Sequence, residues 1–159
     1  MKRSYPRNRS SEAGLTLIEL VIACAILIIL STMALPLTRV TIVRHREALL
    51  RYDLREMRDA IERFKDAADQ NKIQVQAGTE GYPPDLQTLV DGVPLNGAKD
   101  KRIHFLREIP VDPMTGNKDW GMRSVQDDPT TTEWGGTDVF DVFSRSSGTA
   151  LDGSKYADW

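Results

Sequence analysis

The chain has 159 residues, enough for one modest domain and an additional helix, and its formal net charge is −2. The charge is unevenly distributed: residues 1–14 have a net charge of +3, whereas residues 72–159 carry nine Lys or Arg against fourteen Asp or Glu, a net charge of −5. The acidic part has no basic stripe, which argues against nucleic acid as a partner. The single cysteine, Cys24, excludes an intrachain disulfide.

Residues 15–37 form an apolar run that contains one charged side chain, Glu19. At a rise of about 1.5 Å per residue, a helix of this length spans a bilayer. A carboxylate at bilayer depth is costly, so Glu19 indicates a partner or a function that offsets the cost. The basic residues ahead of the run predict that the N-terminus stays in the cytoplasm and that the acidic part crosses the membrane.

Three interpretations of this N-terminus remain open. A cleaved signal peptide would end after Ala34, but it would carry Glu19 inside its apolar region. A plain single-pass anchor would leave Glu19 unexplained. The third interpretation rests on the junction itself, Gly14-Leu15-Thr16-Leu17-Ile18-Glu19.

The helical pattern continues beyond the apolar run to about Asn71. Apolar residues recur there at a spacing of three and four, which predicts an amphipathic helix over residues 38–71 with one buried stripe. The stripe consists of Val43, Leu50, Leu54, Met57, Ile61, Phe64 and Ala68. Glu47 fills the one gap in it, and Pro36 is expected to bend or loosen the helix. The charged residues on the other faces are interpreted as a solvated surface with i,i+4 pairs such as Glu47–Arg51 and Arg58–Glu62.

Residues 72–159 are predicted to form a small head that packs on this stripe. The expected elements are a short helix over Asp85–Val90 capped by Asp85, a loop over Gly92–Lys101, and strands over Asp119–Val125 and Thr137–Ser144. The predicted fold class is therefore α+β, a long N-terminal helix packed on a small antiparallel sheet.

Nothing in the sequence supports catalysis. His45 and His104 stand outside any Cys/His cluster of the kind that binds zinc. A Gly-rich phosphate loop and a Gly-x-Ser-x-Gly motif are both absent from the sequence. We therefore expect a protein that is not an enzyme.

The N-terminal junction resembles that of the type IV pilin and pseudopilin superfamily. The shared features are a short basic leader ending in Gly14, the run Thr16-Leu17-Ile18-Glu19, an apolar helix, and Pro36. The resemblance implies that a prepilin peptidase cleaves after Gly14 and methylates the new amine of Leu15. It also implies a fold with a long helix and a small head.

The physical chemistry of this motif concerns Glu19, the fifth residue after the cleavage point. In a fibre, its carboxylate could pair with the Leu15 amine of a neighbouring subunit. An apolar surrounding strengthens such a pair and makes it costly to leave either charge alone. The alternative is that Glu19 extends toward the lipid headgroups near the helix end.

The head resembles the G-type major pseudopilin of type II secretion. The matching pieces are Tyr82-Pro83, Leu86–Val90, Leu106–Pro113 and Asp141–Ser144. The two resemblances together imply a prepilin leader over 1–14, a transmembrane segment over 15–37, an amphipathic segment over 38–71 and a periplasmic head over 72–159.

The G-type resemblance also implies a calcium site in the last loop. Asp152 and Asp158 would be its carboxylate ligands, since calcium takes six to eight oxygen ligands. The loop differs from the family pattern because it lacks an acid soon after Ser144. The alternative for Asp152 is an ordinary turn residue before Gly153.

The implied function is that of a structural subunit of a periplasmic pseudopilus that drives protein export by type II secretion. The implied partners are further copies in a homopolymer fibre, minor pseudopilins, the prepilin peptidase and an inner-membrane assembly platform. Two alternatives remain. One is a type IV pilin of a surface pilus, a class that often has a C-terminal disulfide loop, and the other is a membrane-anchored periplasmic binding protein.

Overall fold

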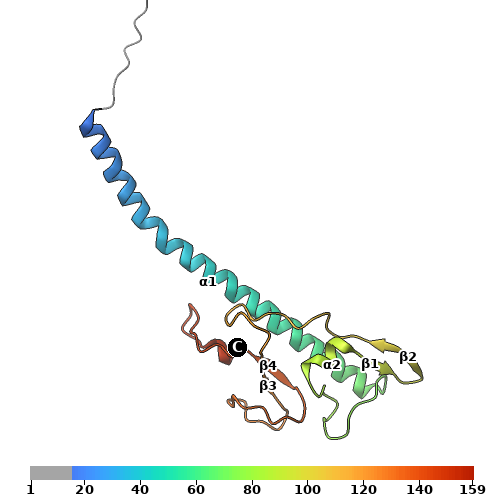
Figure 1. Cartoon of the computed structure of the whole chain (residues 1–159). Helices are drawn as coiled ribbons and strands as arrows, with labels where there is room; N and C mark the ends of the chain where they lie inside the picture. The colour runs from blue at the N-terminus through green and yellow to red at the C-terminus, as the bar shows by residue number, and fades with distance from the viewer. Residues whose placement is uncertain (1–15) are drawn as a thin grey trace, which may run out of the picture. The chain divides into compact units, whose positions relative to one another are not determined.

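The computed structural model describes residues 16–159, apart from the side chains of residues 32–39 and of Lys99. The chain divides into two compact units, Met1–Thr41 and Ile42–Trp159, which are described separately below. Helix α1, Leu17–Asp69, begins in the first unit and continues through the second (Figure 1). The predicted leader, residues 1–14, lies outside the described residues.

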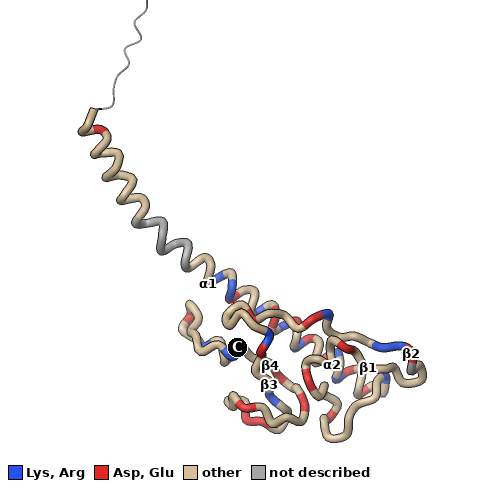
Figure 2. The backbone as a smooth tube through the Cα atoms, viewed as in Figure 1, with Lys and Arg blue, Asp and Glu red and all other residues tan. Residues whose placement is uncertain are grey.

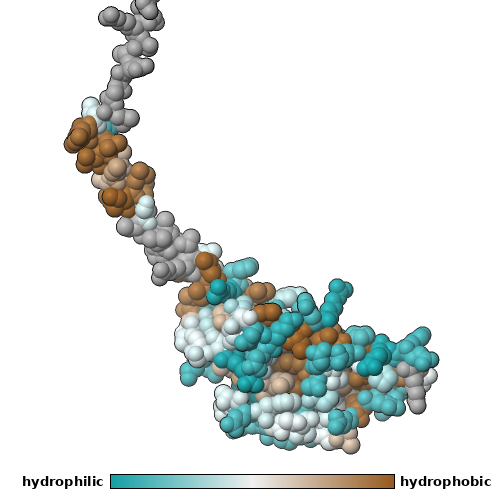
Figure 3. Space-filling model, in the orientation of Figure 1, coloured by the Kyte–Doolittle hydropathy of each residue, from teal (hydrophilic) through white to brown (hydrophobic). Residues whose placement is uncertain are grey.

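The first turn of α1 is capped by Thr16. Its hydroxyl accepts the backbone N–H of Glu19 at 3.3 Å, and its carbonyl accepts the N–H of Leu20 at 3.2 Å. A threonine at this position satisfies donors that have no partner within the helix. The large apolar side chains from Leu17 to Leu30 are each more than half exposed (Figure 3).

Among the described residues, no helix is both long enough and apolar enough to cross a membrane. Within the predicted spanning segment 15–37, Leu15 and the side chains of residues 32–37 fall outside the description.

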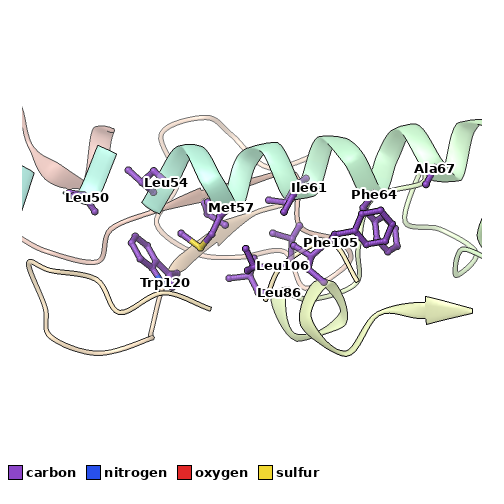
Figure 4. Close-up of a cluster of buried hydrophobic side chains, with 14 of the residues drawn as sticks. Leu50, Leu54, Met57, Ile61, Phe64, Ala67, Leu86, Phe105, Leu106 and Trp120 are labelled. Atoms are coloured by element: carbon purple, nitrogen blue, oxygen red, sulfur yellow. The ribbon is translucent and has the colours of Figure 1, made fainter. Parts of the chain in front are cut away.

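The second unit is built on the apolar stripe of α1. Leu50, Leu54, Met57, Ile61 and Phe64 are buried, each at most 2 % exposed, as the stripe predicts. They share one hydrophobic core with Leu86, Phe105, Leu106 and Trp120, which Figure 4 shows facing the helix. Ala67 lies in this core and the predicted Ala68 packs at its edge.

Helix α1 ends at Asp69, two residues before the predicted end. Asn71 has a φ of 51°, and its N–H donates to the carbonyl of Ala68 at 2.9 Å. The N–H of Lys72 donates to Ala67, also at 2.9 Å. Asparagine tolerates this left-handed conformation, so it ends the helix while satisfying its last carbonyls.

The next elements are a short helix and a hairpin. Helix α2, Leu86–Asp91, confirms the predicted helix, and the carboxylate of Asp85 accepts the N–H of Thr88 at 2.6 Å. The predicted loop over Gly92–Lys101 is wrong, because strands β1, Val93–Leu95, and β2, Ala98–Ile103, form an antiparallel hairpin there. Its turn is Asn96-Gly97, and Gly97 has a φ of 82°. Asn-Gly is a strong hairpin signal that the sequence interpretation missed.

A second antiparallel pair lies beneath α1. Strands β3, Gly121–Arg123, and β4, Asp141–Phe143, are shorter than the predicted strands that contain them. Pairing ends at Ser124 because its N–H donates to Asp127 and the N–H of Val125 donates to Asp138. A 3₁₀ turn, η1, covers Tyr156–Asp158. The fold is α+β as predicted, with two separate two-stranded sheets.

Candidate functional site

Glu19 lies in the first turn of α1 with its side chain exposed. A carboxylate is stabilised at this position because the helix dipole is positive at its N-terminus. The spacing from Thr16 to Glu19 is that of a capping box, a local signal that the sequence interpretation missed. Gly14 and Leu15 lie outside the described residues, so their geometry relative to Glu19 is not part of the structure.

Glu19 is the sole charged residue within 16–31. Apart from Arg39, the other charged residues of α1 lie in the second unit, from Arg44 onward (Figure 2). Residues 16–31 therefore present one carboxylate among exposed apolar side chains. This arrangement suits burial of the helix in an apolar environment, provided that a cation pairs with the carboxylate.

Three charged side chains of α1 hold the last part of the chain, residues 144–159, which we name the C-terminal segment. Glu47 accepts the N–H of Leu151 at 2.8 Å and the hydroxyl of Tyr156 at 3.1 Å. The gap that Glu47 makes in the apolar stripe is thus where the C-terminal segment attaches. Burial, followed by this hydrogen bond to Glu47, raises the pKa of Tyr156.

Arg51 is the second of these side chains. Its guanidinium carbon lies 4.0 Å from the centre of the Trp159 ring, and its Nη2 lies 3.4 Å from a carboxylate oxygen of Asp152. A guanidinium over an indole face is attracted by the ring's negative quadrupole. Trp159 in turn packs edge-on against Tyr156, with ring centres 5.2 Å apart, and its indole N–H donates to Ser154 at 2.7 Å.

Arg58 is the third. It donates to the carboxylate of Asp141 at 2.7 Å and to the backbone oxygens of Val142, at 2.9 Å, and Trp159. Arg51 lies on an exposed face, as predicted. The predicted i,i+4 partners, Glu47 for Arg51 and Glu62 for Arg58, are wrong, because Asp152 and Asp141 take their place. Long guanidinium side chains reach segments that are distant in the sequence, and sequence spacing carries no information on those contacts.

The two predicted calcium ligands, Asp152 and Asp158, lie in different turns of the C-terminal segment. Asp152 is a turn residue whose carboxylate accepts the hydroxyl of Ser154 at 2.6 Å and its N–H at 2.9 Å. These hydrogen bonds, together with Arg51, hold the pKa of Asp152 below its ordinary value. Asp158 is exposed within η1.

The arrangement does not by itself form a calcium cage. The positive charge beside Asp152 is already supplied by Arg51. Among the described residues, no group of three or more His, Cys, Asp or Glu side chains is placed to hold a metal ion. Calcium binding by Asp152 and Asp158 therefore stays a prediction.

Ser144, the first residue of the C-terminal segment, makes a buried contact. Its hydroxyl donates to Asp112 at 2.6 Å, and the other oxygen of Asp112 accepts the N–H of Met114 at 2.7 Å. Both Ser144 and Asp112 are fully buried. Asp53 of α1 is nearby, and its pKa is raised by burial first and by Glu56 and Asp112 next. The start of the C-terminal segment is thus fixed to the turn at 112–117.

Comparison with known proteins identifies one feature of the chain. Residues 9–35 match the family described as "Prokaryotic N-terminal methylation motif". The match includes Gly14, Leu15 and Glu19 and ends before the second unit. No curated protein and no solved structure matches the chain. The chain therefore carries an N-terminal signal of the type IV pilin and pseudopilin kind.

Proposed function

We propose that this chain is a structural subunit of a periplasmic pseudopilus that drives protein export by type II secretion. The observation that carries the proposal is the methylation motif over residues 9–35 with one carboxylate, Glu19, in the first turn of an otherwise apolar stretch of helix. In this proposal, prepilin peptidase cleaves after Gly14 and methylates Leu15. Residues 15–37 anchor the subunit in the inner membrane, and residues 72–159 lie in the periplasm.

The proposed role of Glu19 is to select the position of the next subunit. The cleavage creates an amine on Leu15, and this amine is a cation at neutral pH. The Glu19 carboxylate of one subunit pairs with the amine of its neighbour inside a bundle of apolar helices. A displaced helix would leave both charges unpaired in an apolar environment, which costs several kcal/mol. Staggered helices with matched charges are therefore favoured.

The proposed mechanism is mechanical. An inner-membrane assembly platform lifts subunits out of the bilayer into a homopolymer fibre that also contains minor pseudopilins. The growing fibre pushes exported proteins outward, and the subunit itself catalyses no reaction.

A type IV pilin of a surface pilus is the main rival, because it shares the N-terminal signal. The absence of any cysteine from residues 72–159 favours the secretion proposal, since such pilins often close a C-terminal loop with a disulfide. Deletion of the gene for this chain distinguishes the secretion proposal from the surface-pilus alternative. Loss of exported enzymes from the medium with intact surface pili supports the proposal, and loss of surface pili with normal secretion supports the rival.

Mass spectrometry of the N-terminus of the membrane-bound protein tests the processing step. The expected mature chain begins at N-methylated Leu15. A chain that begins at Leu35 identifies a cleaved signal peptide, and an intact Met1 identifies an unprocessed anchor such as that of a membrane-bound binding protein. Either result overturns the proposal.

A further inference from the structure

Four side chains form a closed cycle of contacts between α1 and the C-terminal segment. Nη2 of Arg51 lies 3.4 Å from Oδ2 of Asp152. The other oxygen of Asp152 accepts the hydroxyl of Ser154 at 2.6 Å, and Ser154 in turn accepts the indole N–H of Trp159 at 2.7 Å. Trp159 completes the cycle, because its ring centre lies 4.0 Å from the guanidinium carbon of Arg51.

Arg51 is the one cation of this cycle, and Asp152 is the one anion. The Arg51 and Asp152 side chains are each 56 % exposed, and an exposed ion pair by itself contributes little to stability. A planar guanidinium, however, can donate to a carboxylate and stack on an aromatic face at once. Arg51 therefore connects two separate residues of the C-terminal segment, Asp152 and Trp159, to α1.

Trp159 is a well-fixed partner for this cation. Its ring packs edge-on against Tyr156, and its backbone oxygen accepts a hydrogen bond from Arg58. Tyr156 is buried, and its hydroxyl donates to Glu47, which lies one turn before Arg51 on α1. The groups that Arg51 contacts are thus already held in place, so little conformational entropy is lost when the guanidinium binds them.

We propose that Arg51, and not a bound metal ion, is the cation that holds the C-terminal segment on α1. The chain supplies the positive charge beside Asp152 from its own helix, and it links that charge to Trp159. A calcium ion would compete with Arg51 for Oδ2 of Asp152. The inference is therefore opposed to the calcium prediction, and it holds whether or not the chain assembles into a fibre.

Backbone hydrogen exchange of the full-length chain in detergent, measured by mass spectrometry, decides between the two cations. The reporter is a peptide that contains Leu151, because its N–H becomes available for exchange when it leaves Glu47. In the wild type, protection of this peptide is expected to be the same in calcium chloride and in chelator. Protection that is lost in chelator and restored by calcium overturns the inference. This comparison uses the wild type alone, so it does not depend on the folding of a variant.

Substitution of Arg51 then identifies the side chain. Arg51→Met keeps an apolar contact with the Trp159 ring but removes the charge, and it should speed exchange of the reporter peptide severalfold in both solutions. The matched control is Arg55→Met, which should leave exchange unchanged. Arg55 is exposed one turn further along α1 and, within the described part of the chain, makes no hydrogen bond or ion pair with the C-terminal segment. Exchange of the Arg51→Met variant at the wild-type rate overturns the inference.

Asp152→Asn provides the last arm of the experiment. This change keeps an oxygen for Ser154 and removes the charge that Arg51 meets. Because Arg51 and Asp152 act in one cycle, the double variant Arg51→Met with Asp152→Asn is expected to exchange no faster than the faster of the two single variants. A double variant whose acceleration equals the product of the two single effects shows that the residues act separately, and it overturns the inference.

Discussion

The guanidinium of Arg58 on α1 donates to the carboxylate of Asp141 on β4 at 2.7 Å. Arg123 on β3 approaches the other oxygen of the same carboxylate at 3.3 Å. Asp141 therefore connects the long helix to both strands of the second sheet. Through its further bonds to the backbone of Val142 and Trp159, Arg58 also connects the helix to the C-terminal segment.

Replacement of Arg58 by methionine should destabilise the second unit. The change keeps much of the apolar stem but leaves two backbone oxygens without their donor and removes one partner of Asp141. We expect the free energy of unfolding to fall by about 1–3 kcal/mol. Urea denaturation of the full chain in detergent measures this loss. Arg55→Met is the matched control and should change stability by no more than about 0.5 kcal/mol. Equal losses in both variants would contradict the assigned role.

Gly121 should not tolerate a side chain. It pairs with Phe143 across β3 and β4, and a Cβ atom at Gly121 would overlap the buried Phe143 ring. Gly121→Ala is therefore expected to destabilise the protein by about 1–3 kcal/mol, as overpacked cores do. In a Phe143→Leu background the same substitution should cost less, because the smaller side chain leaves space. A double-mutant cycle measured by denaturation checks this, and simple additivity would rule the overlap out.

Asp138 should make stability depend on pH. It is fully buried, one carboxylate oxygen has no hydrogen-bond partner, and burial raises its pKa above the ordinary 3.8. The folded state thus binds the proton of the Asp138 carboxyl more tightly than the unfolded state does. Protonated Asp138 therefore contributes to the free energy of unfolding in acid, and this contribution is lost as pH rises through the folded pKa. Asp138→Asn should accordingly gain stability relative to the wild type as pH rises from acidic to neutral.

Asp127→Asn is the control, because its stability relative to the wild type should change with pH in the opposite direction. Backbone hydrogen bonds from Ser124 and Gly135 lower the pKa of Asp127, so its contribution is present at neutral pH and lost in acid. This variant should be destabilised at neutral pH and approach the wild type in acid. Melting temperatures of both variants across the pH range provide the measurement, and parallel curves for the two would refute the assignment.

Glu19→Leu is expected to insert into the membrane normally and to assemble poorly, because the neighbouring amine loses its counter-ion. Quantification of sheared or cross-linked fibres against total membrane-bound protein measures the effect. Thr16→Val is the control for the cap, since it removes the hydroxyl that accepts the N–H of Glu19 but keeps the carboxylate. Near-normal fibre from Thr16→Val with little from Glu19→Leu identifies the charge as the cause. Normal fibre from Glu19→Leu would exclude the pairing.

The calcium prediction has a direct thermal test. If Asp152 and Asp158 bind calcium, the wild type should melt at a higher temperature with calcium than with chelator, and Asp152→Ala with Asp158→Ala should abolish that difference. Identical melting of the wild type in both conditions would rule the site out. Arg51→Met distinguishes the ion pair from the metal, because it should lower the melting temperature in both conditions.

The sequence by itself determined the features that depend on neighbouring residues. The apolar stripe of α1 has helical periodicity, so Leu50 to Phe64 could be assigned to the core before the partners were known. Asp85 was recognisable as a cap because a cap acts on the next turn. The junction from Gly14 to Glu19 was recognisable for the same reason, since its signal lies in a short contiguous run. The Asn96-Gly97 hairpin was equally local and was overlooked.

Only the tertiary structure decided what the charged residues of α1 contact. Arg51 meets Asp152 and Trp159, about one hundred positions away, and Arg58 meets Asp141. Spacing along a helix favours i,i+4 pairs, but Arg51 and Arg58 bind partners from distant segments that the fold brings within reach. Such proximity follows from the packing of the whole unit on its apolar stripe, so no local pattern encodes it.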